Sequence, residues 1–188
     1  MSSIWSKIFL SDIRANYGRV IKKEGPKGNQ VTLRQCQDGD KTITSVFRNK
    51  AQTPVKQTIA STLDVPSPYP GYPVTRTSYV EHLDFEKGKR TYNQVNQDLH
   101  TGKITYTDAN TRVLGNDPSQ RGNGKELFSD RQWFDDSGKI KSRSQVKGKL
   151  TAETQYTPKG KTTVYSKGNE KVMKITYDAD GRRVNYLA

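Results

Sequence analysis

Glycine-centred turns recur at short intervals through the second half of the chain. The glycines at 138, 148, 160, 168 and 181 are separated by 10, 12, 8 and 13 residues. The segments between them alternate polar with apolar residues, which is the period of a β-strand. A chain that reverses so often has room for one strand between turns, so this spacing predicts an antiparallel β-meander. The meander is expected to form a single curved sheet or a small open barrel.

Three of these turns share a pattern: an aromatic residue, three turn-type residues, a glycine and a cation. They read FDDSGK from Phe134, YTPKGK from Tyr156 and YDADGR from Tyr177. Asp or Thr in first position and Gly in fourth suit a type I turn closed by a bulge, so positive φ is expected at Gly138, Gly160 and Gly181. Gly160→Val is expected to cost about 1–2 kcal/mol through turn strain. The spacing of 22 and then 21 residues fits either a true repeat or an ordinary meander.

The segment WFDDSGKIKSRSQVKGKLTAETQYTPKGK resembles the MORN-variant hairpin repeats of toxin-antidote-type proteins. The segment ITYDADGRRV resembles a YD repeat of RHS proteins. Together these resemblances cover residues 127–188, about a third of the chain. They imply an extended β surface used for contacts, and they supply no catalytic residue.

The first 25 residues show a different period. Trp5, Phe9, Ile13 and Tyr17 recur every four residues, which predicts an amphipathic helix that ends at Gly25-Pro26. This helix is expected to dock on a partner or on the sheet. A membrane surface is the less favoured alternative for a basic amphipathic segment.

The remaining organisation follows from turn signals. Residues 26–63 are expected to form a β-hairpin region around the Asp38-Gly39 turn. Residues 64–73 hold four prolines and are expected to form a rigid loop, which could link two β units. Residues 74–188 would form the meander domain. The expected fold class is therefore mainly β, with an N-terminal amphipathic helix.

The charge is large and uneven. The formal net charge is +13, distributed as +7 over residues 1–60, −1 over 61–120 and +7 over 121–188. Such a charge favours acidic partners, and a chain that is only 31% hydrophobic would gain from a partner that covers part of it. Cys36 is the single cysteine, which excludes an intrachain disulfide and favours the cytoplasm. No apolar run is long enough for a transmembrane segment.

No catalytic motif stands out. His82 lies between Glu81 and Asp84 and shares a strand face with Asp84, while His100 lies in the turn-like DLHTGK. There is no P-loop, nucleophile elbow, zinc motif or EF-hand. We therefore expect no enzyme, no cofactor and no metal, with both histidines dispensable. A small basic nuclease-like enzyme that uses His82 or His100 stays open as an alternative.

The basic C-terminal third carries the candidate site. Lys139, Lys141 and Arg143 alternate, so they would share one face of a strand. The further candidate partner-binding residues are Lys147, Lys149, Lys159, Lys161, Arg182 and Arg183, together with Trp5, Phe9, Ile13 and Tyr17. The sequence favours a non-enzymatic basic scaffold, linker or accessory subunit that docks on an acidic protein or assembly. The main alternative is a protein that binds nucleic acid through the basic and aromatic residues of this sheet.

Overall fold

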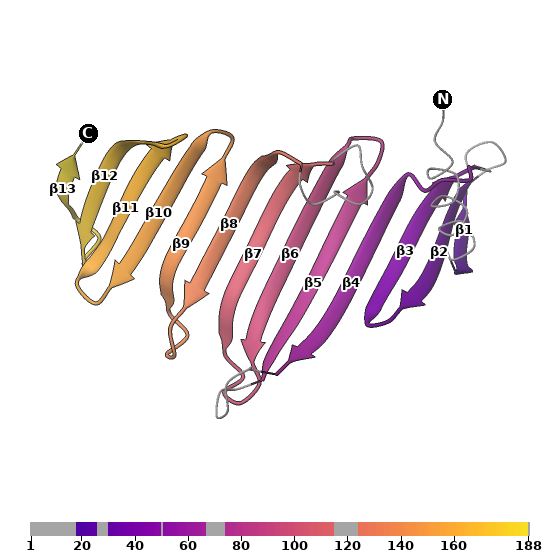
Figure 1. Ribbon diagram of the computed structural model, residues 1–188, viewed down its shortest axis with the longest axis horizontal. Coiled ribbons are helices and arrows are strands. Elements are labelled where there is room, and N and C mark those ends of the chain that lie inside the picture. Colours follow the sequence, from indigo (N-terminus) through magenta and orange to yellow (C-terminus); the bar gives the residue numbers. More distant parts are fainter. Residues whose placement is uncertain (1–17, 26–29, 50, 67–73, 115–123, 188) are drawn as a thin grey trace.

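The computed structural model describes residues 18–25, 30–49, 51–66, 74–114 and 124–187. These residues form one antiparallel sheet of 13 strands, arranged in chain order from β1 to β13 (Figure 1). The strands are β1 (Arg19–Glu24), β2 (Val31–Asp38), β3 (Lys41–Arg48), β4 (Lys56–Val65), β5 (Thr75–Asp84), β6 (Lys89–Asp98), β7 (Ile104–Val113), β8 (Glu126–Phe134), β9 (Ile140–Lys147), β10 (Leu150–Thr157), β11 (Gly160–Lys167), β12 (Glu170–Asp178) and β13 (Arg183–Leu187). The predicted meander is confirmed. It is an open sheet, because β1 and β13 lie at its two opposite edges.

The predicted N-terminal helix is wrong. No helix occurs among the described residues, and Arg19–Glu24, the end of the expected helix, is strand β1. Its β-branched Val20 and Ile21 suit a strand, and pairing with β2 supplies the backbone hydrogen bonds that a short isolated helix holds only marginally. Trp5, Phe9, Ile13 and Tyr17 lie outside the described residues.

The proline-rich segment joins strands of the same sheet. Asp64 and Val65 belong to the end of β4, and β4 pairs with β5 over its full length, from Lys56↔Asp84 to Val65↔Thr75. The strands before and after the segment are therefore direct neighbours. Within the described residues there is also no helix with the length and apolar character needed to cross a membrane.

The register defines the two faces of the sheet. One row of directly opposed residues crosses eight strands: Tyr79, Gln94, Asp108, Arg131, Ser144, Glu153, Val164 and Lys174. Opposed residues share a face, so these side chains lie on one side of the sheet. Leu83, four residues from Tyr79, lies on that side, and Ile175, next to Lys174, lies on the other. We refer to the two sides as the Leu83 face and the Ile175 face.

Little apolar surface is buried on either face. Among the described residues, the buried hydrophobic side chains are Phe47, Leu83 and Ile175. Small polar residues are buried as well, and Ser45 and Ser129 have no exposed surface at all. Ser45 is opposed by Arg34 and Gln57, and Gln57 Nε2 donates to its Oγ at 3.0 Å. Long polar side chains therefore cover short ones, which lets a single layer exclude water without a second sheet.

The hairpin turns are of two main kinds. At Gly39, Gly148 and Gly168, a two-residue loop begins with a glycine at φ of +59°, +64° and +65°. At the β8–β9 and β12–β13 hairpins, the turn is followed by a shift in register. The predicted positive φ of Gly138, Gly160 and Gly181 is confirmed, at +84°, +132° and +80°. Gly160 differs from the other two, because it pairs directly with Thr157 across the loop and no bulge follows.

Aspartate side chains hold the turns at several hairpins. Asp135 Oδ1 accepts hydrogen bonds from the backbone N–H groups of Ser137 and Lys139, at 2.9 and 3.0 Å. Asp178 Oδ1 accepts one from Arg182 N at 2.8 Å, and Asp84 Oδ1 accepts one from Lys87 N at 3.0 Å. These bonds give the turn N–H groups partners that the ladder does not supply.

Asp135→Asn should make the free energy of unfolding less dependent on pH in the acid range. Hydrogen bonds from Ser137 and Lys139 lower the pKa of Asp135 in the folded protein. A carboxylate whose pKa is lower in the folded state stabilises the protein at every pH above its unfolded-state pKa of about 3.9. This stabilisation is lost as the pH falls through the folded-state pKa. Urea titrations between neutral pH and below pH 4 should therefore show a smaller loss of unfolding free energy for the variant than for the parent. Asp136→Asn is the matched control, and an equal effect there would contradict the turn assignment.

Candidate interaction surface

The register gathers tyrosines and cations on the Ile175 face of β9 to β13. One row runs Tyr156, Lys161, Tyr177 and Arg183, so the rings alternate with the cations from strand to strand. Other rows on this face contribute Lys147 and Lys167, which both oppose Leu150, together with Tyr165 and Tyr186. We call this surface the basic–tyrosine face, formed by Arg143, Lys147, Tyr156, Lys161, Tyr165, Lys167, Tyr177, Arg183 and Tyr186.

Two of its rings are covered by cations. Lys161 Nζ lies 5.0 Å from the ring centroid of Tyr177, and Arg183 Cζ lies 5.6 Å from that of Tyr186. These distances are within the range of cation–π attraction. The contacts order the long side chains along the face while their charges stay accessible, because Lys161 and Arg183 are both exposed.

Arg143 is less available than its sequence position suggests. Its Nε and Nη2 donate to the two carboxylate oxygens of Asp130 on β8, at 2.8 and 2.5 Å. This bidentate bond raises the pKa of Arg143 and lowers the pKa of Asp130. Arg143 therefore anchors β9 to β8, and the exposed Lys147 on the same strand contributes an accessible charge to this face.

The other predicted cations lie elsewhere. Lys139 is in the β8–β9 turn rather than on the strand, and the register shift after this turn passes over Lys141, so the strand pairing places neither lysine on the face of Arg143. Lys149, Lys159 and Arg182 also lie in turns. Lys174 opposes Val164 on the Leu83 face. The register therefore splits the sequence cluster into a face, the turns and the opposite side.

The reverse side of the same strands has a different chemistry. On β9 to β11 the Leu83 face presents Ser142, Ser144, Thr151, Thr162 and Ser166, with the carboxylate of Glu153 bound by Ser144 Oγ at 2.6 Å. These are small, mostly neutral side chains. On β9 to β11 the cations and tyrosines are thus gathered on the Ile175 face, while Lys171 and Lys174 of β12 lie on the Leu83 face.

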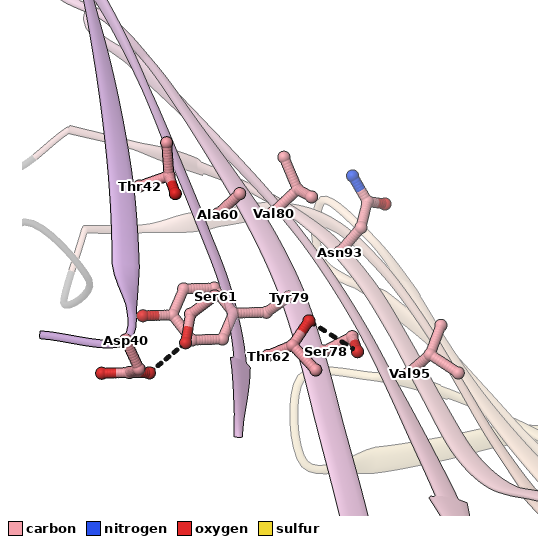
Figure 2. A pocket seen from close by; sticks show the side chains of 10 residues that line it. All are labelled: Asp40, Thr42, Ala60, Ser61, Thr62, Ser78, Tyr79, Val80, Asn93 and Val95. Atoms are coloured by element: carbon pink, nitrogen blue, oxygen red, sulfur yellow. Dashed lines mark hydrogen bonds between the residues drawn. The ribbon is translucent and has the colours of Figure 1, made fainter. Parts of the chain in front are cut away.

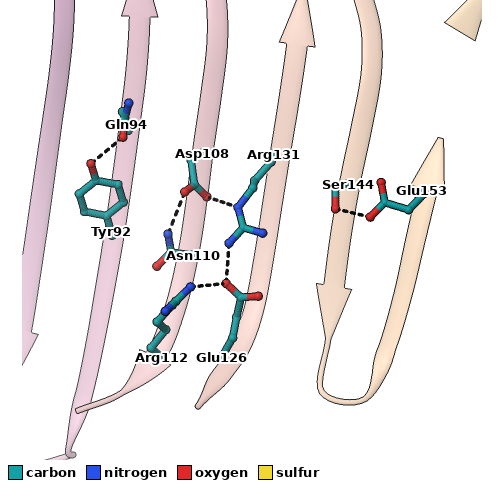
Figure 3. A network of polar contacts seen from close by, with 9 residues as sticks. All are labelled: Tyr92, Gln94, Asp108, Asn110, Arg112, Glu126, Arg131, Ser144 and Glu153. Atoms are coloured by element: carbon teal, nitrogen blue, oxygen red, sulfur yellow. Dashed lines mark hydrogen bonds and ion pairs between the residues drawn. The ribbon is translucent and has the colours of Figure 1, made fainter. Parts of the chain in front are cut away.

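The centre of the Leu83 face carries a polar network (Figure 3). Arg131 bonds Glu126 at 2.7 Å and lies 3.5 Å from Asp108, and Arg112 bonds Glu126 at 3.1 Å. Asn110 Nδ2 donates to Asp108 at 3.1 Å. The charges are matched within the network, and paired charges with little exposure fix strand register rather than leave a free group for chemistry. We assign this network a structural role.

The two histidines are held far apart. His82 lies on β5 opposite Thr91, near one end of β6, whereas His100 follows the other end of β6. The seven strand steps from Thr91 to Asp98, the last residue of β6, span roughly 24 Å at about 3.4 Å per residue, and His100 lies in the turn beyond. His82 and His100 therefore cannot act as a catalytic pair. Among the described residues, no group of three or more His, Cys, Asp and Glu side chains is placed to hold a metal ion.

A shallow hollow of about 480 Å³ lies across β3 to β6 (Figure 2). Its lining includes short residues such as Ala60, Ser78 and Val80, with Asn93 beside them. The carboxylate of Asp40 at its margin is bound by Ser61 Oγ, and Thr62 bonds Ser78 at 3.1 Å. The hydrogen bond from Ser61 lowers the pKa of Asp40, which favours the charged form of this carboxylate.

Sequence reasoning missed a second group of cations. Lys56, Lys87 and Lys89 come from β4, the β5–β6 turn and β6, in a part of the chain whose charge is nearly balanced. The signal that could have found them is the repeated order Asp-x-x-x-Gly-Lys at 84–89 and 98–103, which marks two further hairpins. Strand pairing then brings Lys56 opposite Asp84.

No family model matches the chain, and no curated protein or solved structure matches it. The resemblance of residues 127–188 to MORN-variant and YD hairpin repeats therefore stays a prediction.

Proposed function

We propose that this protein is a non-enzymatic docking module whose basic–tyrosine face binds an acidic surface of a partner protein. The observation that carries the proposal is the row of alternating tyrosines and cations on one face of β10 to β13. Opposite charge at such a surface speeds encounter and fixes orientation, and tyrosine supplies contact area at low entropic cost.

Apolar residues on the same face favour a protein partner. Leu150 is 54% exposed, and the half-buried Met173 shares its side of the sheet. A protein interface buries such residues at its centre and places charges around them. An extended single layer also offers a broad surface without any movement of the backbone.

Single-stranded nucleic acid is the second candidate, favoured by the presence of tyrosines among cations. Base stacking needs open ring faces, however, and a cation already lies over one face of Tyr177 and of Tyr186. Because these cations leave fewer ring faces open for a base, we rank an acidic protein surface first.

Replacing Lys147, Lys161 and Lys167 by Ser should weaken binding of a fluorescent glutamate-rich peptide by about tenfold or more. The loss of three charges from the contact face removes the attraction directly, and folding should be unchanged because exposed cations contribute within about 0.5 kcal/mol each. The matched control replaces Lys149, Lys171 and Lys174 by Ser, which removes the same charge from a turn and from positions that the register assigns away from this face. Fluorescence anisotropy at physiological ionic strength measures both.

An equal loss in the two triple variants would show general charge attraction and contradict the proposed face. A single-stranded oligonucleotide of matching charge forms the second arm. Tight oligonucleotide binding, with a log K against log salt slope that the first variant flattens by about two units, would replace the protein partner by nucleic acid.

A further inference from the structure

A second hollow lies on the Ile175 face beside the β5–β6 hairpin. Its volume is about 330 Å³, and its lining includes Lys56, His82, Lys87, Lys89 and Thr91. Register explains this assembly, because Lys56 opposes Asp84, and Asp84 opposes Lys89. In the next row, Thr58 opposes His82, and His82 opposes Thr91. Three strands and one turn thus contribute to a single concave site.

The charge around this hollow is not balanced locally. Asp84 is its one lining carboxylate. Its Oδ1 accepts the Lys87 N–H at 3.0 Å and its Oδ2 lies 3.5 Å from Lys56 Nζ. The nearby Glu86 is paired with Arg48 at 2.8 Å. Neither Lys87 nor Lys89 forms an ion pair with a described residue, so two ammonium groups are left for a ligand.

His82 adds a directed donor. Its Nδ1 lies 3.0 Å from Thr58 Oγ1. When the hydroxyl donates to Nδ1, the proton of the neutral imidazole is on Nε2, which then serves as a hydrogen-bond donor. The Thr91 hydroxyl at the next position of the row is a further donor from the same lining.

We propose that this hollow binds the phosphate group of a small phosphorylated molecule. Ammonium groups from several chain segments, an imidazole N–H and a hydroxyl match the many acceptor sites and the double negative charge of phosphate. A volume of about 330 Å³ exceeds that of phosphate alone, which leaves room for the group that carries it. The site lies on β4 to β6, apart from the basic–tyrosine face, so it is independent of the proposed docking function.

The test is a nuclear magnetic resonance titration of the full chain with inorganic phosphate, and separately with phenyl phosphate. The expected result is a saturable change of the His82 ring signals and of the amides around 56–58 and 84–91. Tighter binding of phenyl phosphate would assign the site to phosphomonoesters, and equal binding would assign it to free phosphate. No saturable change at these signals with either compound would overturn the proposal.

Lys89→Gln and His82→Gln should each weaken this binding by about tenfold, because each removes one donor to a charged group. Lys171→Gln and His100→Gln are the matched controls, remote from the hollow, and should leave binding unchanged. Since the four side chains are exposed, thermal melts should coincide with that of the parent. Equal weakening by the control variants, or changes centred on the basic–tyrosine face, would show diffuse charge attraction and overturn the site.

Discussion

Gly160→Val should lower the free energy of unfolding by about 3 kcal/mol or more, beyond the 1–2 kcal/mol that turn strain alone predicts. Gly160 has a φ of +132°, a conformation that valine rarely adopts. A Cβ atom here would also overlap the carbonyl oxygen of Tyr177 and lie 2.7 Å from the carbonyl carbon of Asp178. Since both contacts are to the backbone of β12, the strand itself would have to shift. Urea unfolding followed by circular dichroism measures the loss.

Gly168→Val provides the comparison for this effect. Gly168 has a φ of +65°, and a Cβ there would meet no atom within 4 Å. The expected cost is about 1 kcal/mol, from backbone strain alone. Equal losses of unfolding free energy at Gly160 and Gly168 would mean that the contact with the β12 backbone adds nothing to the cost of the Gly160 substitution.

Leu83→Ala should also cost about 3 kcal/mol. Leu83 is 1% exposed and is one of three buried hydrophobic residues among those described, so the sheet has little other apolar packing to absorb a cavity. Its neighbours in the row are Gln57 and Arg90, whose stems cover it from both sides. The same urea experiment gives the change in unfolding free energy.

Leu63→Ala is the matched control for Leu83→Ala. Leu63 lies on the same face in the adjacent strand, yet it is 51% exposed. Its truncation should cost less than about 1 kcal/mol, because most of its surface is already in water. A similar cost at both positions would show that burial on the Leu83 face does not stabilise the sheet.

The two proposed sites differ in how far the sequence predicts them. The basic cluster of the last third is visible in the sequence as composition, and Lys147, Lys161 and Arg183 do lie on one face. The sequence predicts Arg143 as a partner-binding cation, but Asp130 is 13 positions away and becomes its partner through the pairing of β8 with β9. In the β5–β6 hollow, Lys87 and Lys89 belong to one local turn motif, but Lys56 joins them only through the pairing of β4 with β5.

The sequence by itself determined where the chain turns, because glycine at positive φ and aspartate that binds turn N–H groups are local chemistry within four or five residues. It thereby determined the strands and the meander. Only the tertiary structure decided that the sheet is open, that β1 replaces the end of the expected helix, and which cations share a face. These outcomes depend on cross-strand register, and a shift of one residue would move every side chain to the other face. Each register is set by the geometry of the connecting turn and by any bulge that follows it, and the alternation of residue types along one strand does not specify either of these.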